Sequence, residues 1–138
     1  MLKVKIEPWC FAPTRAHDTD AGYDLKTPIC VKVEPHSSAI IDTGVHVMLP
    51  PGKCAVVISK SGLCMSYDLT STGLVDEGFT GTIRVKLFNH GDRPYTFSRG
   101  EKISQFYITN YYAEEIELVD EFPDTERGDS GYGSTGKY

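Results

Sequence analysis

Short runs in which apolar and polar residues alternate, each followed closely by turn residues, restrict the fold of this chain more than any other feature. Two runs carry apolar residues at every second position: Ile29, Val31 and Val33, and Ile83, Val85 and Leu87. Because successive side chains of a β-strand point to opposite faces, a period of two is typical of strands with one buried face. Three further β-rich runs lie at 39–49, 54–59 and 103–108.

Turn residues separate these runs. Segments rich in proline, glycine, serine, histidine or aspartate lie at 34–37, 50–52, 90–94 and 98–100, and such residues favour turns for backbone reasons. No segment keeps a helical period, and residues 62–68 could form at most one or two helical turns. The pattern therefore predicts an all-β fold of sandwich, jelly-roll or barrel type.

The length and composition predict one domain that spans residues 1–138. A chain of 138 residues with 40% hydrophobic content can bury a substantial core, but it is short for two domains. From about residue 120 the apolar alternation is replaced by acidic residues, proline and glycine. We therefore expect a folded core over about 1–119 and a flexible C-terminal arm over about 120–138.

The charge and the apolar content exclude several classes of protein. A net charge of −5 does not suit a general nucleic-acid binder, which needs a broad basic surface to displace counterions. No apolar run approaches the roughly 20 residues of a membrane span, and the first residues lack the apolar stretch of a signal peptide. We expect an intracellular, cytoplasmic protein that binds neither nucleic acid nor membranes; in a viral case it would occupy the host cytoplasm or nucleus.

The cysteines and histidines form no recognisable metal-binding pattern. The four cysteines, at positions 10, 30, 54 and 64, include no CxxC pair, and a disulfide framework is not expected in a chain without an export signal. The four histidines show no HExxH pattern. We expect buried free thiols and no metal ion held directly by protein side chains.

The segment Arg127–Tyr138 combines four glycines with two cations, hydroxyl groups and aromatic rings. Glycine lets the backbone approach a ligand closely and aim several N–H groups at it, which suits phosphate oxygens. Tyr132 offers a flat face on which a base can stack. Phosphate and base together indicate a nucleotide, although a glycine- and serine-rich terminus is also typical of a disordered end without a specific role.

Two internal segments carry further candidate groups. In Gly73–Gly81 the acidic pair Asp76 and Glu77 lies between two apolar runs and is bracketed by glycines, which predicts a hairpin with a carboxylate at its bend. In Ser59–Leu63 a lysine, two serines and a glycine follow an apolar strand, which suits phosphate oxygens. Taken alone, each segment is more typical of an ordinary solvated turn.

Five segments taken together, in chain order, are far more specific than any one of them. They are DAGYDL at 20–25, KSG at 60–62, GLVDEGFTG at 73–81, GEKISQ at 100–105 and RGDSGYGSTG at 127–136. In sequence and order they resemble the five motifs of the trimeric dUTP pyrophosphatase (dUTPase) family, over nearly the whole chain.

This resemblance implies a fold, an assembly and an activity. The expected subunit is a distorted jelly roll, or β-clip barrel, with a C-terminal arm, and three identical subunits would share their active sites. The expected reaction is the hydrolysis of dUTP to dUMP and pyrophosphate with Mg²⁺, which limits the entry of uracil into DNA and supplies dUMP.

The resemblance also implies roles for individual residues. Asp76 falls on the carboxylate that activates water, and Phe79 on the aromatic ring that packs against deoxyribose. Asp24 and Gln105 fall near the metal-bound triphosphate, where they would act through water without ligating the metal directly. Three residues fall on the phosphate-binding turn: Lys60, Ser61 and Gly62.

Uracil recognition and the arm account for the remaining implied positions. Thr70 lies where many family members have an asparagine that helps to read uracil, so recognition would rest more on backbone groups near Gly73 and Leu74. Arg127 falls on the arginine that grips phosphate, and Tyr132 on the ring that covers uracil. The other implied substrate-binding positions are Val75, Gly133, Ser134 and Thr135.

Two departures from the family pattern affect the expected chemistry. Lys60 stands where arginine is usual, which replaces a bidentate fork by a point charge and makes phosphate orientation less strict. Phe79 replaces the more common tyrosine, so stacking is kept and only a hydroxyl contact is lost.

Other functions on the same fold stay open at this point. One is a dCTP deaminase, or a bifunctional deaminase and dUTPase, although such deaminases generally lack the complete arm motif. Another is a regulatory protein whose nucleotide-ordered arm signals to a protein partner.

Overall fold

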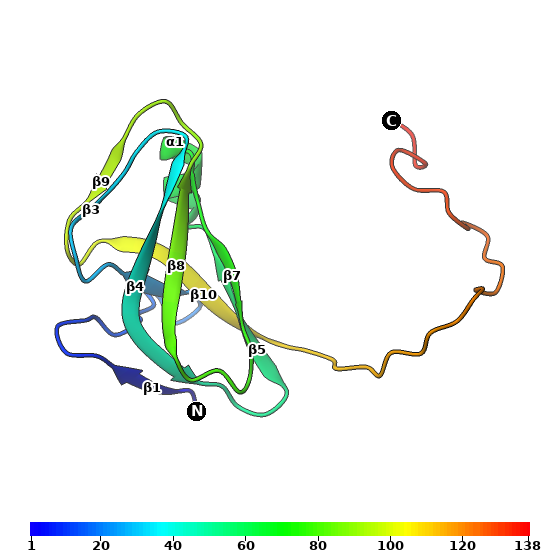
Figure 1. Ribbon diagram of the computed structural model, residues 1–138, viewed down its shortest axis with the longest axis horizontal. Helices are drawn as coiled ribbons and strands as arrows, with labels where there is room; N and C mark the ends of the chain where they lie inside the picture. The colour runs from blue at the N-terminus through cyan, green and yellow to red at the C-terminus, as the bar shows by residue number, and fades with distance from the viewer.

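The chain forms ten β-strands and one short helix, seen in a computed structural model that describes residues 1–138 (Figure 1). The elements are β1 (Lys3–Ile6), β2 (Tyr23–Lys26), β3 (Val31–Val33), β4 (Ser37–Met48), β5 (Lys53–Ile58), α1 (Ser61–Tyr67), β6 (Leu69–Thr70), β7 (Thr72–Val75), β8 (Thr82–Asn89), β9 (Tyr95–Phe97) and β10 (Lys102–Asn110). The prediction of an all-β fold is confirmed. The seven residues of α1 are too few to form a membrane-spanning helix.

The strands form two four-stranded antiparallel sheets and one two-stranded sheet. The strand orders are β1-β4-β8-β6, β2-β10-β5-β7 and β3-β9. The longest strand, β4, bends where its register with β8 shifts between Asp42 and His46 (Figure 1). Gly44 adopts a φ of 65° inside this bulge, and its N–H donates to the Asp42 carboxylate. The architecture is jelly-roll-like, and the sheets do not close into a barrel.

The core lies between the two larger sheets. On β8 the alternating residues Ile83, Val85 and Leu87 are buried, as the period of two predicted. They pack in one cluster with residues of the other sheet, including Val57 and Phe106. Each fully buried side chain of this size contributes about 1.5–3 kcal/mol, so the alternation on a few strands accounts for much of the driving force for folding.

One predicted strand begins later than expected. Ile29 lies outside β3 and is exposed. The hydroxyl of Thr27 donates to the Ile29 carbonyl and accepts from the Ile29 N–H, so these two backbone groups are used in a local turn and cannot pair with another strand.

The segment 73–81 is not the predicted hairpin. Strand β7 pairs with β5 in one sheet, whereas β8 pairs with β4 and β6 in the other. Residues 76–81 therefore form a connection that crosses between the two sheets. A turn is present, because the Phe79 N–H donates to the Asp76 carbonyl over 3.0 Å.

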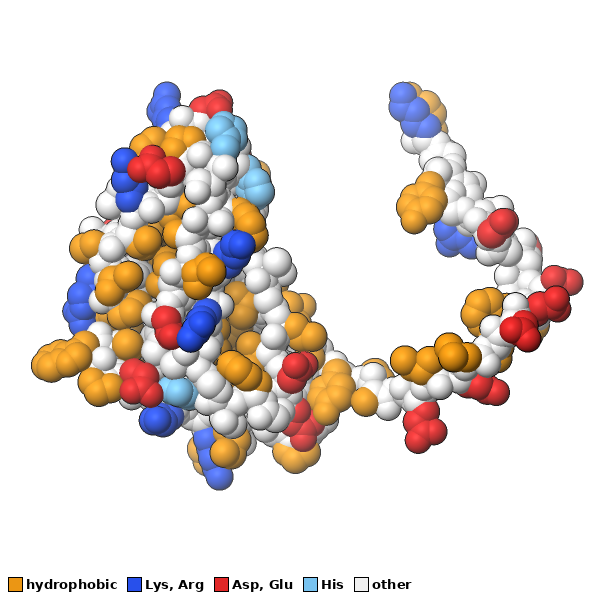
Figure 2. Space-filling model, in the orientation of Figure 1, with side chains coloured by type: hydrophobic (Ala, Val, Ile, Leu, Met, Phe, Trp, Pro, Cys, Tyr) orange, Lys and Arg blue, Asp and Glu red, His pale blue; other side chains and the backbone are white.

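The arm leaves the body of the molecule directly after β10. Regular structure ends at Asn110, earlier in the chain than the boundary near residue 120 that composition suggested. Residues 111–138 extend away from the sheets and contain neither helix nor strand (Figure 1). Acidic and hydrophobic side chains line this arm (Figure 2), and its exposed apolar residues include Tyr112, Ile116, Leu118 and Phe122.

Candidate functional site

A cleft of about 610 Å³ lies beside the connection between β7 and β8. Gly73, Leu74 and Val75 of β7 form one part of its lining, and Phe79 of the connection forms another. These are residues that the sequence placed at uracil and deoxyribose, and the fold brings them together. We call this the loop cleft.

Gly81 makes room for the Phe79 ring in the loop cleft. A Cβ atom added to Gly81 would lie 2.7 Å from Cζ of the Phe79 ring, which is closer than side chains tolerate. Only glycine at position 81 therefore lets the ring occupy this place. The ring remains 45% exposed, so one of its faces is available to a ligand.

The two acids of the connection have different surroundings. The Glu77 carboxylate accepts hydrogen bonds from the Tyr111 hydroxyl at 2.6 Å and the Gly52 N–H at 2.9 Å. These bonds lower the pKa of Glu77, and the bond to Glu77 raises the pKa of Tyr111. Asp76 is exposed and forms no ion pair or side-chain hydrogen bond. Glu77 thus anchors the connection, while the Asp76 carboxylate is free to act on a ligand or water.

A second cleft, of about 450 Å³, contains the other predicted polar groups. Asp24, Lys60, Lys102 and Gln105 contribute to its lining. We call it the lysine cleft. Two of its walls come from the ends of neighbouring strands, because β10 pairs with both β2 and β5.

Asp24 lies between two lysines in the lysine cleft. Its side chain is nearly buried and accepts hydrogen bonds from Lys60 and, at 2.6 Å, from Lys102. Burial alone would raise the pKa of Asp24, but the hydrogen bonds and charges of Lys102 and Lys60 outweigh it, and the pKa is lowered. The expected phosphate-binding lysine is therefore paired with an acid in the chain as it stands.

Gln105 is fixed beside the same cleft by two close contacts. Its amide nitrogen donates to the Ser59 carbonyl at 3.1 Å. A Cβ atom added to Gly22 would lie 2.4 Å from its amide oxygen, so the glycine of the first motif makes room for this side chain. Ser61 and Gly62 lie close by in the exposed first turn of α1.

Thr70 does not reach the loop cleft. Its hydroxyl hydrogen-bonds His90 at 2.7 Å, and its backbone pairs with Phe88 near the end of β8. The loop cleft lies at the start of β8, near Thr82. Within one chain Thr70 therefore lies apart from the loop cleft, because β6 joins the opposite end of the strand. Its role in uracil recognition stays a prediction.

The predicted residues of the arm contact neither cleft in this single chain. Arg127 donates only to the Ser130 carbonyl at 2.8 Å, and Tyr132 is fully exposed. Gly133, Ser134 and Thr135 are exposed as well.

Lys60 and Asp76 lie at opposite ends of the ladder between β5 and β7. Ala55 pairs with Val75, so Asp76 lies level with Cys54, whereas Lys60 follows the other end of β5. At about 3.3 Å per residue, this separates the two residues by about 20 Å. The backbone positions of the two residues are therefore well separated within one chain.

Three residues near these clefts were missed by the sequence reasoning. Lys102 lies within the segment 100–105, and its charge beside Asp24 could have been anticipated from that segment. Tyr111 and His46, by contrast, gave no signal, because their partners Glu77 and Thr80 are distant in sequence.

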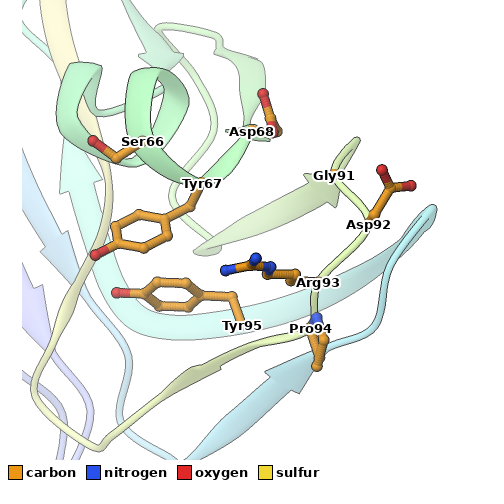
Figure 3. Close-up of a pocket in the computed structure, with 8 residues that line it drawn as sticks. All are labelled: Ser66, Tyr67, Asp68, Gly91, Asp92, Arg93, Pro94 and Tyr95. Carbon is orange, nitrogen blue, oxygen red and sulfur yellow. The ribbon is translucent and has the colours of Figure 1, made fainter.

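A third cavity, of about 450 Å³, lies at the end of the molecule that holds α1 (Figure 3). The rings of Tyr67 and Tyr95 meet edge to face with centroids 4.7 Å apart, and the Arg93 side chain points toward them (Figure 3). None of the residues predicted from the sequence lines this cavity.

The sequence model of the dUTPase family matches residues 10–136. The chain belongs to the dUTPase family. A deoxyuridine 5'-triphosphate nucleotidohydrolase of Gloeothece citriformis is 39% identical, over 98% of this chain and 96% of the relative. The chain is therefore assigned to the dUTP pyrophosphatase class of enzymes.

Solved dUTPase structures have the same fold. The dUTPase of Staphylococcus bacteriophage 80alpha with dUPNHPP superposes with a TM-score of 0.91 at 30% identity, covering 99% of this chain and 98% of that one. A mutant dUTPase of S. aureus phage phi11, described with a structural Mg(II) ion, gives a TM-score of 0.80 at 27% identity, over 88% and 98% of the two chains.

Proposed function

We propose that this dUTPase hydrolyses dUTP to dUMP and pyrophosphate, with Asp76 as the residue that activates the attacking water. Asp76 accepts a proton from water as the water oxygen attacks the α-phosphorus. The bond from that phosphorus to the pyrophosphate oxygen breaks, and the proton on Asp76 returns to solvent. Positioning and charge neutralisation supply most of the rate enhancement.

The observation that carries this proposal is the free carboxylate of Asp76 beside the loop cleft. Its neighbour Glu77 is occupied by two hydrogen bonds, whereas Asp76 has none on its side chain. An acid without a fixed partner can accept a proton from a bound water, which is what a general base requires.

The loop cleft supports selectivity for deoxyuridine. Backbone groups of Gly73 and Leu74 would pair with the uracil edge, and Phe79 would pack on the sugar where a ribose 2'-hydroxyl has no room. Fixed donors and acceptors disfavour cytosine because they would face the wrong partners. A narrow cleft around uracil would also leave no room for the thymine methyl. We therefore propose that dTTP, UTP and dCTP are poor substrates.

The proposed Mg²⁺ enters with the triphosphate. In the chain itself, no group of three or more His, Cys, Asp or Glu side chains is arranged to hold a metal ion, and Asp24 is already paired with two lysines. Asp24 and Gln105 would contact the hydrated ion through water. When bound, Mg²⁺ neutralises charge on the phosphates.

We further propose a homotrimer whose active sites are shared between subunits. The separation of about 20 Å along the β5–β7 ladder supports this, because residues so far apart in one chain are brought to one substrate more readily from two different chains. The extended arm, with its exposed apolar side chains, is suited to cross to a neighbouring subunit and bring Arg127 and Tyr132 to its nucleotide.

The test is pyrophosphate release from a panel of nucleotides, compared between the wild type and Asp76→Asn. The asparagine side chain has the shape of aspartate but cannot accept a proton from the attacking water. Turnover should therefore fall about 10²–10⁴-fold, while the affinity for dUTP should stay within a few-fold of the wild-type value. Glu77→Gln is the matched control and should keep far more turnover. Near-wild-type turnover in Asp76→Asn would remove Asp76 from its role, and ammonia release from dCTP would instead indicate a deaminase.

A further inference from the structure

His46 on β4 joins the connection 76–81 to the end of β1. Its Nδ1 lies 2.7 Å from the Thr80 carbonyl oxygen, and its Nε2 lies 2.8 Å from a carboxylate oxygen of Glu7. The side chain is mostly buried, with 18% of its surface exposed. Thr80 lies directly after Phe79, so this bond holds the backbone beside the ring in the loop cleft.

Both partners of His46 are hydrogen-bond acceptors. A carbonyl oxygen and an ionised carboxylate can only accept, whereas a neutral imidazole has one N–H and one acceptor nitrogen. Both bonds can therefore form together only if the ring carries a proton on each nitrogen. Glu7 is ionised at neutral pH, because the hydrogen bond from His46 and the nearby Lys5 lower its pKa.

The other charged groups near His46 are few and largely paired. On the β1 side, Lys5 lies directly across from His46 in the ladder and its Nζ is 3.4 Å from the Glu7 carboxylate. On the β8 side, Arg84 pairs with Asp42 at 3.5 Å. The Glu77 carboxylate is bound by Gly52 and Tyr111.

We propose that His46 is a positioning residue whose doubly protonated ring tethers Thr80, and thereby Phe79, in the conformation that binds the deoxyribose. The proposal rests on the assignment of the loop cleft to deoxyuridine. It adds a group outside the five motifs, and it predicts that substrate affinity depends on one proton.

Loss of that proton should weaken the tether in a defined way. A neutral ring keeps a single N–H, and the charged Glu7 carboxylate is a stronger acceptor than the Thr80 carbonyl. The remaining N–H therefore goes to Glu7, and the bond to Thr80 is lost. As the pH rises, KM for dUTP should increase about three- to tenfold, the usual worth of one hydrogen bond, with little change in kcat.

Three variants separate this tether from a general structural role. Asn at position 46 places its amide nitrogen near Nδ1 and can donate to Thr80, whereas Gln reaches toward Glu7. The KM of His46→Gln for dUTP should be raised at every pH. The KM of His46→Asn should be lower than the KM of His46→Gln and should not rise with pH as that of the wild type does. In Glu7→Gln the new amide donates to Nε2, so a neutral ring satisfies both partners and the rise of KM with pH should disappear.

The experiment measures KM and kcat for dUTP from about pH 5 to about pH 9, with ¹⁵N NMR of the His46 ring in nucleotide-free protein. His36→Asn is the control, because His36 forms its ion pair with Asp92 on the exposed surface. We expect the wild type to keep protons on both ring nitrogens to a higher pH than Glu7→Gln does.

The two proposals fail in different ways. A wild type that leaves dUTP intact would contradict the proposed function, while the NMR spectra would still report the protonation of His46. An active wild type whose His46 ring loses its second proton at the same pH as in Glu7→Gln, or the same rise of KM with pH in Glu7→Gln, would overturn the tether alone.

Discussion

The hydroxyl of Tyr111 donates a 2.6 Å hydrogen bond to the carboxylate of Glu77, which joins the first residue of the arm to the neighbour of Asp76. The Tyr111 N–H also donates to the Gly52 carbonyl, and Gly52 in turn donates to Glu77. The root of the arm and the connection 76–81 are thereby held as one unit.

Tyr111→Phe should loosen this unit and raise the pKa of Glu77. The folded-state pKa of Glu77 is lowered from its ordinary value of 4.5, so its stabilising effect is present above that pH and is lost as the pH falls through the lowered value. The melting temperature of Tyr111→Phe should therefore be lower than that of the wild type at neutral pH, and the two should be equal in acid. Tyr112→Phe is the control, because Tyr112 is 85% exposed. An unchanged pKa of Glu77, measured by NMR in Tyr111→Phe, would contradict the prediction.

Gly81→Ala should weaken substrate binding without unfolding the protein. The added Cβ would meet the Phe79 ring at 2.7 Å, and this exposed ring can move aside only by leaving its place in the loop cleft. We expect kcat/KM for dUTP to fall about tenfold, within the usual cost of overpacking. Gly78→Ala is the matched control, because nothing lies within 4 Å of a Cβ there. Equal kinetics in the two variants would refute the argument.

Asp24→Asn should destabilise the fold in a pH-dependent way. Removing the charge between Lys60 and Lys102 should lower the free energy of unfolding by about 1–3 kcal/mol at neutral pH. Because the pKa of Asp24 is lowered below its ordinary 3.8, the stabilisation is complete above that pH and is lost as the pH falls through the lowered value. Denaturant titrations should show that the difference in unfolding free energy between the wild type and Asp24→Asn decreases below pH 3.8. Asp92→Asn, at an exposed ion pair, should change little at any pH.

Deletion of residues 127–138 should abolish most activity and leave the melting temperature unchanged. These residues form hydrogen bonds only with other residues of the arm, so the sheets lose no contact. Turnover should fall by about an order of magnitude or more, because the arm no longer closes over the nucleotide. Full turnover in the truncated protein would show that the arm is dispensable.

Mixed trimers test whether Lys60 and Asp76 of one site come from different chains. Asp76→Asn and Lys60→Ala should each be weakly active alone. After the two are unfolded and refolded together, one site in each mixed trimer combines both native residues, so about a quarter of wild-type activity should return. Recovery no greater than the average of the two single variants would place both residues in a site within one chain.

Local patterns in the sequence were enough to predict five of the strands, β3, β4, β5, β8 and β10, and a short helical segment near α1, but they gave no prediction for β1, β2, β6 and β9. Alternation placed Ile83, Val85 and Leu87 on the buried face of β8, and that is where they lie. Ile29 was assigned wrongly because the Thr27 hydroxyl competes for its backbone groups. The hairpin at 73–81 was wrong because β7 pairs with β5 in one sheet and β8 pairs with β4 in the other.

The chemistry of the candidate site could also be predicted, but its assembly could not. The five segments identified the acid, the phosphate-binding turn and the arm. They did not reveal that Lys60 is paired with Asp24, that Thr70 bonds His90, or that His46 holds Thr80. Each of these contacts joins residues at least 20 positions apart in the chain.

The amino-acid sequence by itself determined which segments are strands, which are turns and which side chains can do chemistry, because periodicity and backbone preference act over a few neighbouring residues. Only the tertiary structure decided which strands pair, which acid is free and which is bound, and that Lys60 and Asp76 stand apart. Those outcomes depend on how distant strands bury their apolar faces together, and no local pattern encodes that choice of partner.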